Sequence, residues 1–135
     1  MSRLASVRRL SAAERRILTL GWLLLVVAPL ALRVIPLRRM LTLARPRRRA
    51  DVPPERLARL VEVAARGVPG ARCLPVAVVT AWLLARQGTP ATLRIGVART
   101  AGRLRAHAWL ERGGVPLLRA SEAEGYTPIL SVAVP

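Results

Sequence analysis

The sequence has one cysteine, one histidine, one tyrosine and no phenylalanine among its 135 residues. A lone cysteine excludes an internal disulfide, and we therefore expect a cytoplasmic protein. One cysteine and one histidine are too few ligands for a zinc site, so we expect neither a metal nor a cofactor. The sequence also lacks a glycine-rich phosphate loop and a serine nucleophile elbow, which argues against the enzyme classes that use them.

Lysine is absent as well: all 23 basic residues are arginine, and the formal net charge is +16. A charge of this size favours an anionic partner, which could be a membrane surface, a nucleic acid or an acidic protein. A solvated, arginine-rich surface explains it equally well. Aromatic residues are few and no recognition motif occurs, so we expect no specific nucleic-acid partner.

Apolar residues are concentrated near the amino terminus. Ser11 and Glu14 have the capping-box spacing that predicts the start of a helix. This helix would enter the uncharged run Ile17–Leu32, which has arginines on both sides. Extended to Leu37, the run reaches the roughly 20 residues that span a bilayer.

Three roles for this segment remain open. Pro29 and Pro36 should kink or break the helix. The stretch Ile17–Leu37 could contact a membrane, dock on a partner protein, or pack on the rest of the chain. We divide the sequence into an apolar helical segment with an arginine-rich linker, residues 1–50, and a folded domain, residues 51–135.

Two helices are predicted at the start of the second part. The first opens at Pro54 and buries one face, because its apolar residues follow the i, i+3, i+4, i+7 pattern: Leu57, Leu60, Val61 and Ala64. The second runs from Cys73 to Arg86 and ends at Gly88, a left-handed cap. It is apolar almost all round, so we expect it to be the central buried helix.

Strands follow the second helix. Apolar and polar residues alternate over Leu93–Val97 and again over Leu104–Glu111, where His107 lies on the face opposite Leu110. Gly113-Gly114 predicts a two-residue hairpin turn. A return strand over Val115–Leu118 and a last strand over Thr127–Val134 complete a small antiparallel sheet. The predicted fold is α+β.

The order of these elements places a thiol and an imidazole where they could act together. Cys73 lies at the amino-terminal end of a helix, where the helix dipole favours a thiolate and free backbone amides can bind an oxyanion. His107 on the sheet could then transfer the proton. The alternative is structural: Cys73 is a buried helix-cap residue and His107 a polar residue of an edge strand.

A third group usually orients such an imidazole. Counting back from the hairpin turn pairs His107 with Ala120 and makes Glu122 a diagonal neighbour on the same face. Glu122 is therefore the favoured third group, and Glu111, on the histidine strand itself, is the next.

Three stretches of the sequence resemble one known family. They are the Arg72-Cys73-Leu74-Pro75 motif, the helix end and strand over Leu83–Val97, and the His-Ala-Trp motif within Ala106–Glu111. In this order they resemble the B2 proteins of lasso-peptide biosynthesis, over residues 54–126. The resemblance implies a papain-like, transglutaminase-like fold with Cys73 as nucleophile and His107 as base.

The resemblance also implies an activity and partners. Such a protein is a leader peptidase, which cleaves the precursor of a threaded, ribosomally made peptide. A separate cyclase similar to asparagine synthetase then forms the macrolactam. The chain leaves no room for a leader-recognition domain, so the resemblance implies a separate leader-recognition (B1-type) protein as partner.

One position departs from the family pattern. The family's aspartate would fall at Leu118 or Arg119, neither of which can orient an imidazole in its place. Glu122, a backbone carbonyl or a water molecule could take the place of this aspartate. The departure leaves a second function open, in which the chain is a catalytically weak scaffold that docks the recognition protein and the cyclase, at a membrane or away from one.

Overall fold

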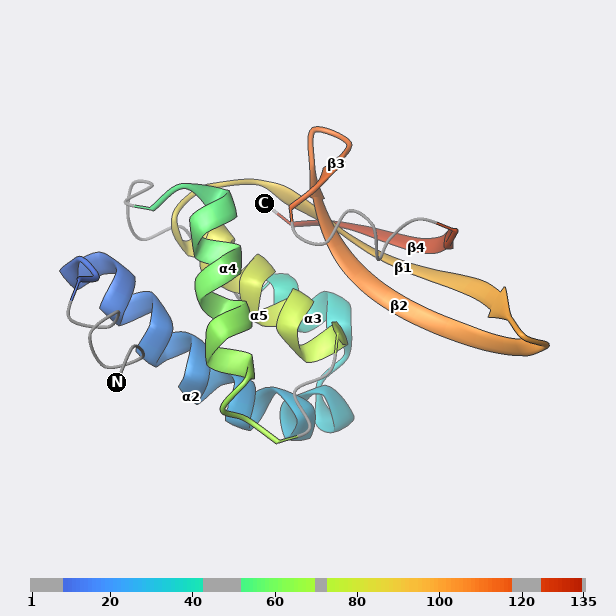
Figure 1. The fold of residues 1–135 in the computed structure, drawn as a ribbon, viewed down its shortest axis with the longest axis horizontal. Helices are drawn as coiled ribbons and strands as arrows, with labels where there is room; N and C mark the ends of the chain where they lie inside the picture. Colours follow the sequence, from blue (N-terminus) through green and yellow to red (C-terminus); the bar gives the residue numbers. More distant parts are fainter. Residues whose placement is uncertain (1–8, 43–51, 70–72, 118–124, 135) are drawn as a thin grey trace.

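The computed structural model describes residues 9–42, 52–69, 73–117 and 125–134. Its helices gather on one side and its strands on the other (Figure 1). The helices are α2 (Ala12–Val34), α3 (Leu37–Thr42), α4 (Pro54–Ala65) and α5 (Cys73–Arg86). The strands are β1 (Ala91–Thr100), β2 (Arg103–Arg112), β3 (Val115–Pro116) and β4 (Thr127–Val134).

Helix α2 begins at the predicted capping box. The Ser11 side chain accepts a hydrogen bond from the backbone N–H of Glu14, and the Glu14 carboxylate accepts one from the backbone N–H of Ser11. The helix continues through Pro29, so the predicted break does not occur at this residue. Leu25 and Ala28, in the same part of the helix, are buried. Their packing offsets the destabilisation that a proline causes inside a helix.

The apolar segment packs on the rest of the chain. Helix α2 lies against α4 and α5, with Ile17, Gly21, Leu25 and Ala28 buried. A Cβ atom added to Gly21 would lie 3.8 Å from Val61 Cγ2, in ordinary van der Waals contact. Of the three roles left open for Ile17–Leu37, the structure shows the third, in which the segment packs on the rest of the chain.

Helix α4 begins at the predicted Pro54, and helix α5 has the predicted bounds. All four residues of the predicted apolar face of α4 are buried. Helix α5 is buried along most of its length, and Gly88 ends it with a φ of 73°. Helix α5 therefore forms the centre of the core, as its composition predicts.

The four strands form one antiparallel sheet in the order β3-β2-β1-β4. Arg112 pairs with Val115 across the predicted two-residue turn. Strand β3 covers only Val115–Pro116, shorter than predicted, and Leu118 lies outside the described residues. Strand β4 has the bounds that the alternation indicates.

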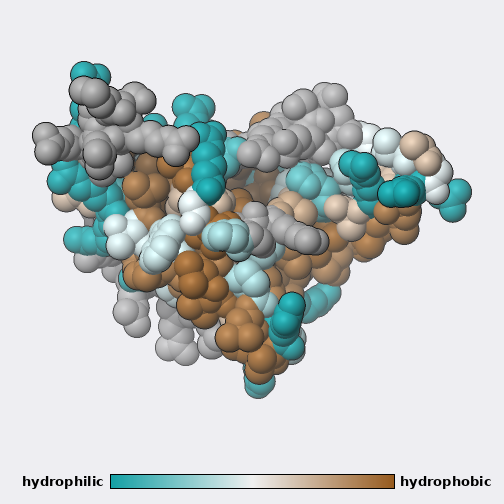
Figure 2. All heavy atoms as spheres, turned by 60° about the horizontal axis from the view of Figure 1, so that its bottom comes forward, coloured by the Kyte–Doolittle hydropathy of each residue, from teal (hydrophilic) through white to brown (hydrophobic). Residues whose placement is uncertain are grey.

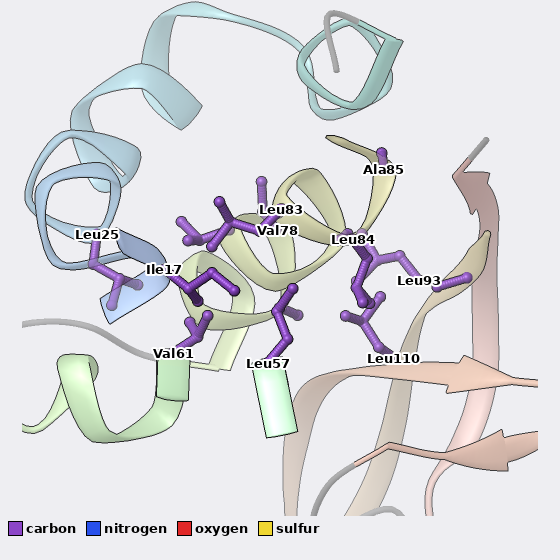
Figure 3. Packing of buried hydrophobic residues seen from close by; sticks show 14 of the residues in the cluster. Ile17, Leu25, Leu57, Val61, Val78, Leu83, Leu84, Ala85, Leu93 and Leu110 are labelled. Atoms are coloured by element: carbon purple, nitrogen blue, oxygen red, sulfur yellow. The ribbon is translucent and has the colours of Figure 1, made fainter. Parts of the chain in front are cut away.

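The core lies between the helices and one face of the sheet. Leu84 of α5, Leu93 of β1 and Leu110 of β2 meet there, while Ile17 and Leu25 of α2 and Val61 of α4 lie on the other side of α5 (Figure 3). Burial of these side chains provides the main stabilisation of the fold.

Candidate functional site

Cys73 is the first residue of α5, so the sequence places the thiol at the amino-terminal end of a buried helix. The side chain is half-buried, is not in a disulfide, and packs at the margin of the apolar core. The first backbone N–H groups of a helix have no acceptor within it and are available to an anion or an oxyanion. Arg72, the neighbouring positive charge in the motif, lies outside the described residues.

His107 lies in the middle of β2 and pairs with Gly96 of β1. Directly paired residues of an antiparallel ladder point to the same face of the sheet. This face, which we call the outer face, carries Arg94, Gly96, His107, Trp109 and Glu111. The opposite inner face carries the residues that pack toward α5, namely Leu93, Ile95, Ala108 and Leu110.

Two aromatic rings lie next to the imidazole of His107. The Trp109 ring stacks on His107 with a centroid distance of 5.9 Å and an interplanar angle of 18°. The Tyr126 ring lies 5.3 Å from His107 at an angle of 42°. The imidazole therefore has a defined plane, and it is half-buried among groups that restrict its rotation.

Gly96 is the residue that allows Trp109 to lie over the sheet. A Cβ atom at this position would be 2.7 Å from Trp109 Cη2 and 3.0 Å from the backbone oxygen of Thr127. Distances this short force a displacement, so only glycine leaves room for the indole ring. Trp109 is 7% exposed, although the alternation assigned it to the polar side of the strand.

Glu111 fixes the other edge of the indole. Its Oε1 accepts a hydrogen bond from Trp109 Nε1 at 2.9 Å, and its Oε2 accepts one from Arg94 Nε at 2.6 Å. Arg94 also donates to Ser131 Oγ of β4 at 3.1 Å. Glu111 is the second candidate for the third group. One of its carboxylate oxygens accepts a hydrogen bond from Trp109 and the other accepts one from Arg94.

The two main candidates lie on elements that pack directly against each other, α5 and β2. However, His107 lies on the outer face of the sheet, whereas α5 packs against the inner face. Cys73 packs against the apolar core, and His107 contacts the rings of Trp109 and Tyr126. Glu122 lies outside the described residues, as do Ala120, Leu118 and Arg119. Their predicted roles stay predictions.

Sequence reasoning missed the part played by Trp109, Tyr126 and Arg94. A signal for the first was present, because His107, Trp109 and Glu111 alternate on one strand opposite a glycine. Tyr126 reaches His107 through the pairing of β1 with β4, in which Val97 pairs with Thr127. Within the described ranges, no group of three or more His, Cys, Asp or Glu residues could hold a metal ion.

A comparison with protein-family models identifies the fold. The model of the transglutaminase-like superfamily matches residues 6–131, which is most of the chain. The chain belongs to the transglutaminase-like superfamily. The matched region includes the apolar helix α2 as well as α4, α5 and the sheet. Neither the curated proteins nor the solved structures gave a match.

Membership in this superfamily agrees with the predicted α+β fold of helices packed on a small antiparallel sheet. It is a superfamily whose members are typically cysteine proteases or transglutaminases. A transglutaminase-like domain that carries its sole cysteine at the start of α5 and its sole histidine in β2 has residues of the types that this chemistry uses.

Proposed function

We propose that this protein is a cysteine endopeptidase that removes the leader from a lasso-peptide precursor before the macrolactam is formed. One observation carries the proposal: the only cysteine begins α5, and the only histidine lies in β2, whose inner face packs against α5. The reaction requires the imidazole, which lies on the outer face of β2, to come within reach of the thiol at the start of α5. The ordered motifs around these two residues resemble those of the lasso-peptide B2 proteins, which supports the choice of substrate.

The reaction uses Cys73 as nucleophile and His107 as general acid and base. His107 takes the proton of the Cys73 thiol, and the thiolate attacks the carbonyl carbon of the leader–core bond. Backbone amides at the start of α5 stabilise the oxyanion. The C–N bond then breaks as His107 protonates the leaving amine, which becomes the amino terminus of the core. His107 next removes a proton from water, and the hydroxide hydrolyses the thioester and releases the leader.

Contacts on the outer face would add to the orientation that a third group gives the imidazole. Trp109 lies against the imidazole plane, and Glu111 holds the indole through Nε1. Glu111 would thus act on His107 only through Trp109, as a positioning residue. Glu122 stays the proposed third member of the site, because counting back from the hairpin turn makes it a diagonal neighbour of His107 on the same face.

The proposed partners are a leader-recognition protein and the precursor peptide, with the asparagine-synthetase-like cyclase as a further candidate. We propose that the protein works in the cytoplasm, since the precursor is made there and a reduced thiol is required. No cofactor takes part in the reaction.

Mass spectrometry of the precursor tests this function. The full chain is mixed with the recognition protein and the precursor, and Cys73→Ala, His107→Ala and Glu122→Ala are compared with Arg105→Ala. Arg105 is an exposed residue of the same strand. We expect one cut at the leader–core junction, lost with Cys73→Ala and lowered about 10²–10⁴-fold with His107→Ala. Equal cutting by Cys73→Ala and the parent would reject the proposal.

A second candidate function is the weakly catalytic scaffold. The specific observation in its favour is that Leu118 or Arg119 stands where the family has aspartate, while Glu111 is bonded to Trp109 and Arg94. Normal lasso-peptide production by cells carrying Cys73→Ala would establish this function in place of the peptidase.

A further inference from the structure

Helix α2 has two apolar faces, and the fold uses only one of them. The buried residues Ile17, Gly21, Leu25 and Ala28 contribute to the packing of α2 on α4 and α5. A second set of large apolar side chains is exposed: Trp22, Leu23, Val26, Val27, Leu30 and Val34. At 3.6 residues per turn the exposed set covers about 140° of the helix, opposite the buried set.

We call these six exposed residues the outward face of α2. The exposure is large, reaching 67% for Leu30 and 77% for Val34. Figure 2 shows the apolar surface on the side of the molecule to which α2 belongs. Contiguous exposed apolar surface of this kind marks an interaction site with a protein or a membrane.

The charges around the outward face are positive. Arg16 lies near one end of the helix and Arg33 near the other, and both fall on the same side as the exposed apolar residues. Helix α3 adds the exposed Arg38 and Arg39. Glu14, the only acidic residue of α2, is bonded to Arg56 and to the backbone of Ser11.

We propose that the outward face of α2 docks the protein on a negatively charged membrane, with the helix lying in the plane of the interface. An apolar stripe with arginines at its ends suits this position, because the long side chains can reach lipid phosphates while the stripe enters the acyl boundary. Trp22 is of the residue type that is enriched at membrane interfaces.

Helix α2 has 23 residues and includes an 18-residue stretch that is long and apolar enough to span a membrane. A spanning position would expose Leu25 and Ala28 to lipid and remove them from α4 and α5. Docking in the plane keeps this packing and covers only the outward face. Docking of this kind leaves the fold intact and is independent of the proposed peptidase activity.

Flotation with vesicles tests the proposal. The full chain is mixed with vesicles of phosphatidylcholine alone or of phosphatidylcholine with phosphatidylglycerol. The test variant is Val26→Asp/Leu30→Asp, and the matched control is Leu104→Asp/Ile129→Asp. The control residues are also exposed, but they lie in strands β2 and β4. Circular dichroism establishes that both variants are folded.

We expect binding to the anionic vesicles, reduced about tenfold or more by Val26→Asp/Leu30→Asp and unchanged by the control. Subtracting the fluorescence spectrum of Trp22→Phe from that of the parent gives the emission of Trp22. This emission should shift to shorter wavelength on binding. Alkaline carbonate should release the protein from the vesicles, because a helix that lies in the interface is held less tightly than a helix that spans the bilayer.

Three results would overturn the proposal. Equal binding by the two variants would mean that arginine charge alone attracts the protein. Resistance to carbonate would mean that α2 spans the bilayer. Absence of binding, together with self-association in light scattering that Val26→Asp/Leu30→Asp abolishes, would assign the outward face to a second copy of the chain.

Discussion

The two faces of the β1–β2 ladder are built on different physical principles. The inner face meets α5 through aliphatic side chains, among them Leu93 and Leu110. The outer face carries an imidazole, an indole and a carboxylate–guanidinium pair joined by directional contacts. Aliphatic packing is roughly proportional to buried area, while stacked rings and hydrogen bonds fix orientation.

The stability of the fold and the candidate chemistry therefore depend mainly on different faces of the sheet. Changes on the inner face should lower the free energy of unfolding without altering the orientation of His107. Changes on the outer face should disturb the imidazole more than they disturb the fold. The predictions below test this separation.

The largest loss of stability is expected from Leu93→Ala. Leu93 is 1% exposed, and removing a buried leucine side chain costs about 2–5 kcal/mol. Urea denaturation measures the change, and Leu104→Ala serves as the control because Leu104 is 69% exposed. A loss below about 1 kcal/mol would show that this face contributes less than its burial indicates.

The next largest effect is expected from Gly96→Ala. The new methyl group would meet Trp109 Cη2 at 2.7 Å, so the indole has to move. We expect a loss of about 1–3 kcal/mol and a changed tryptophan fluorescence spectrum. Gly21→Ala is the control, since its methyl group would make only ordinary contacts, the nearest at 3.8 Å. Identical spectra for Gly96→Ala and the parent would contradict the proposed close approach.

An effect on stability of similar size to that of Gly96→Ala is expected from Glu111→Ala. This substitution removes the acceptor for Trp109 Nε1 and the partner of Arg94, at a cost of about 1–3 kcal/mol. The stacking of Trp109 on His107 should loosen, which the weakening of NOEs between the two rings would reveal. Glu111→Gln retains an acceptor oxygen and should restore part of the contact. Unchanged NOEs in Glu111→Ala would show that the carboxylate does not position the indole.

The smallest effect is expected at the start of α2. The hydrogen bond from the backbone N–H of Ser11, followed by that from Arg56, holds the pKa of Glu14 below its ordinary value of 4.5. Because the folded-state pKa is lowered, the charged carboxylate stabilises the fold at neutral pH. That contribution is lost as the pH falls through the folded-state value. Glu14→Gln should thus have a lower urea midpoint than the parent at neutral pH only. A difference that persists in acid would contradict this.

Local patterns in the sequence were enough to predict much of the fold. The capping box at Ser11, the start of α5 at Cys73 and the pairing of Arg112 with Val115 all follow from short-range rules on helix ends and turns. The alternation in β2 also predicted correctly that His107 and Leu110 lie on opposite faces.

The contacts of the candidate site depend on pairing between distant segments. Tyr126 reaches His107 only because β4 pairs with β1, and no local period in the sequence specifies that partner. Trp109 is buried because Gly96, thirteen positions earlier, leaves room for it. For α2, hydropathy predicted a helix, but the choice of Gly21 and Leu25 as its buried side depends on α4 and α5.

The most direct test of the account is the rate at which Cys73 is alkylated by iodoacetamide as a function of pH. Cys73 is the only cysteine, so the label reports one thiol. If His107 and Cys73 act as a pair, the imidazole activates the thiol, so the parent should be alkylated faster than His107→Ala at neutral pH. Superimposable pH profiles for the parent and His107→Ala would contradict the pairing on which the proposed peptidase rests.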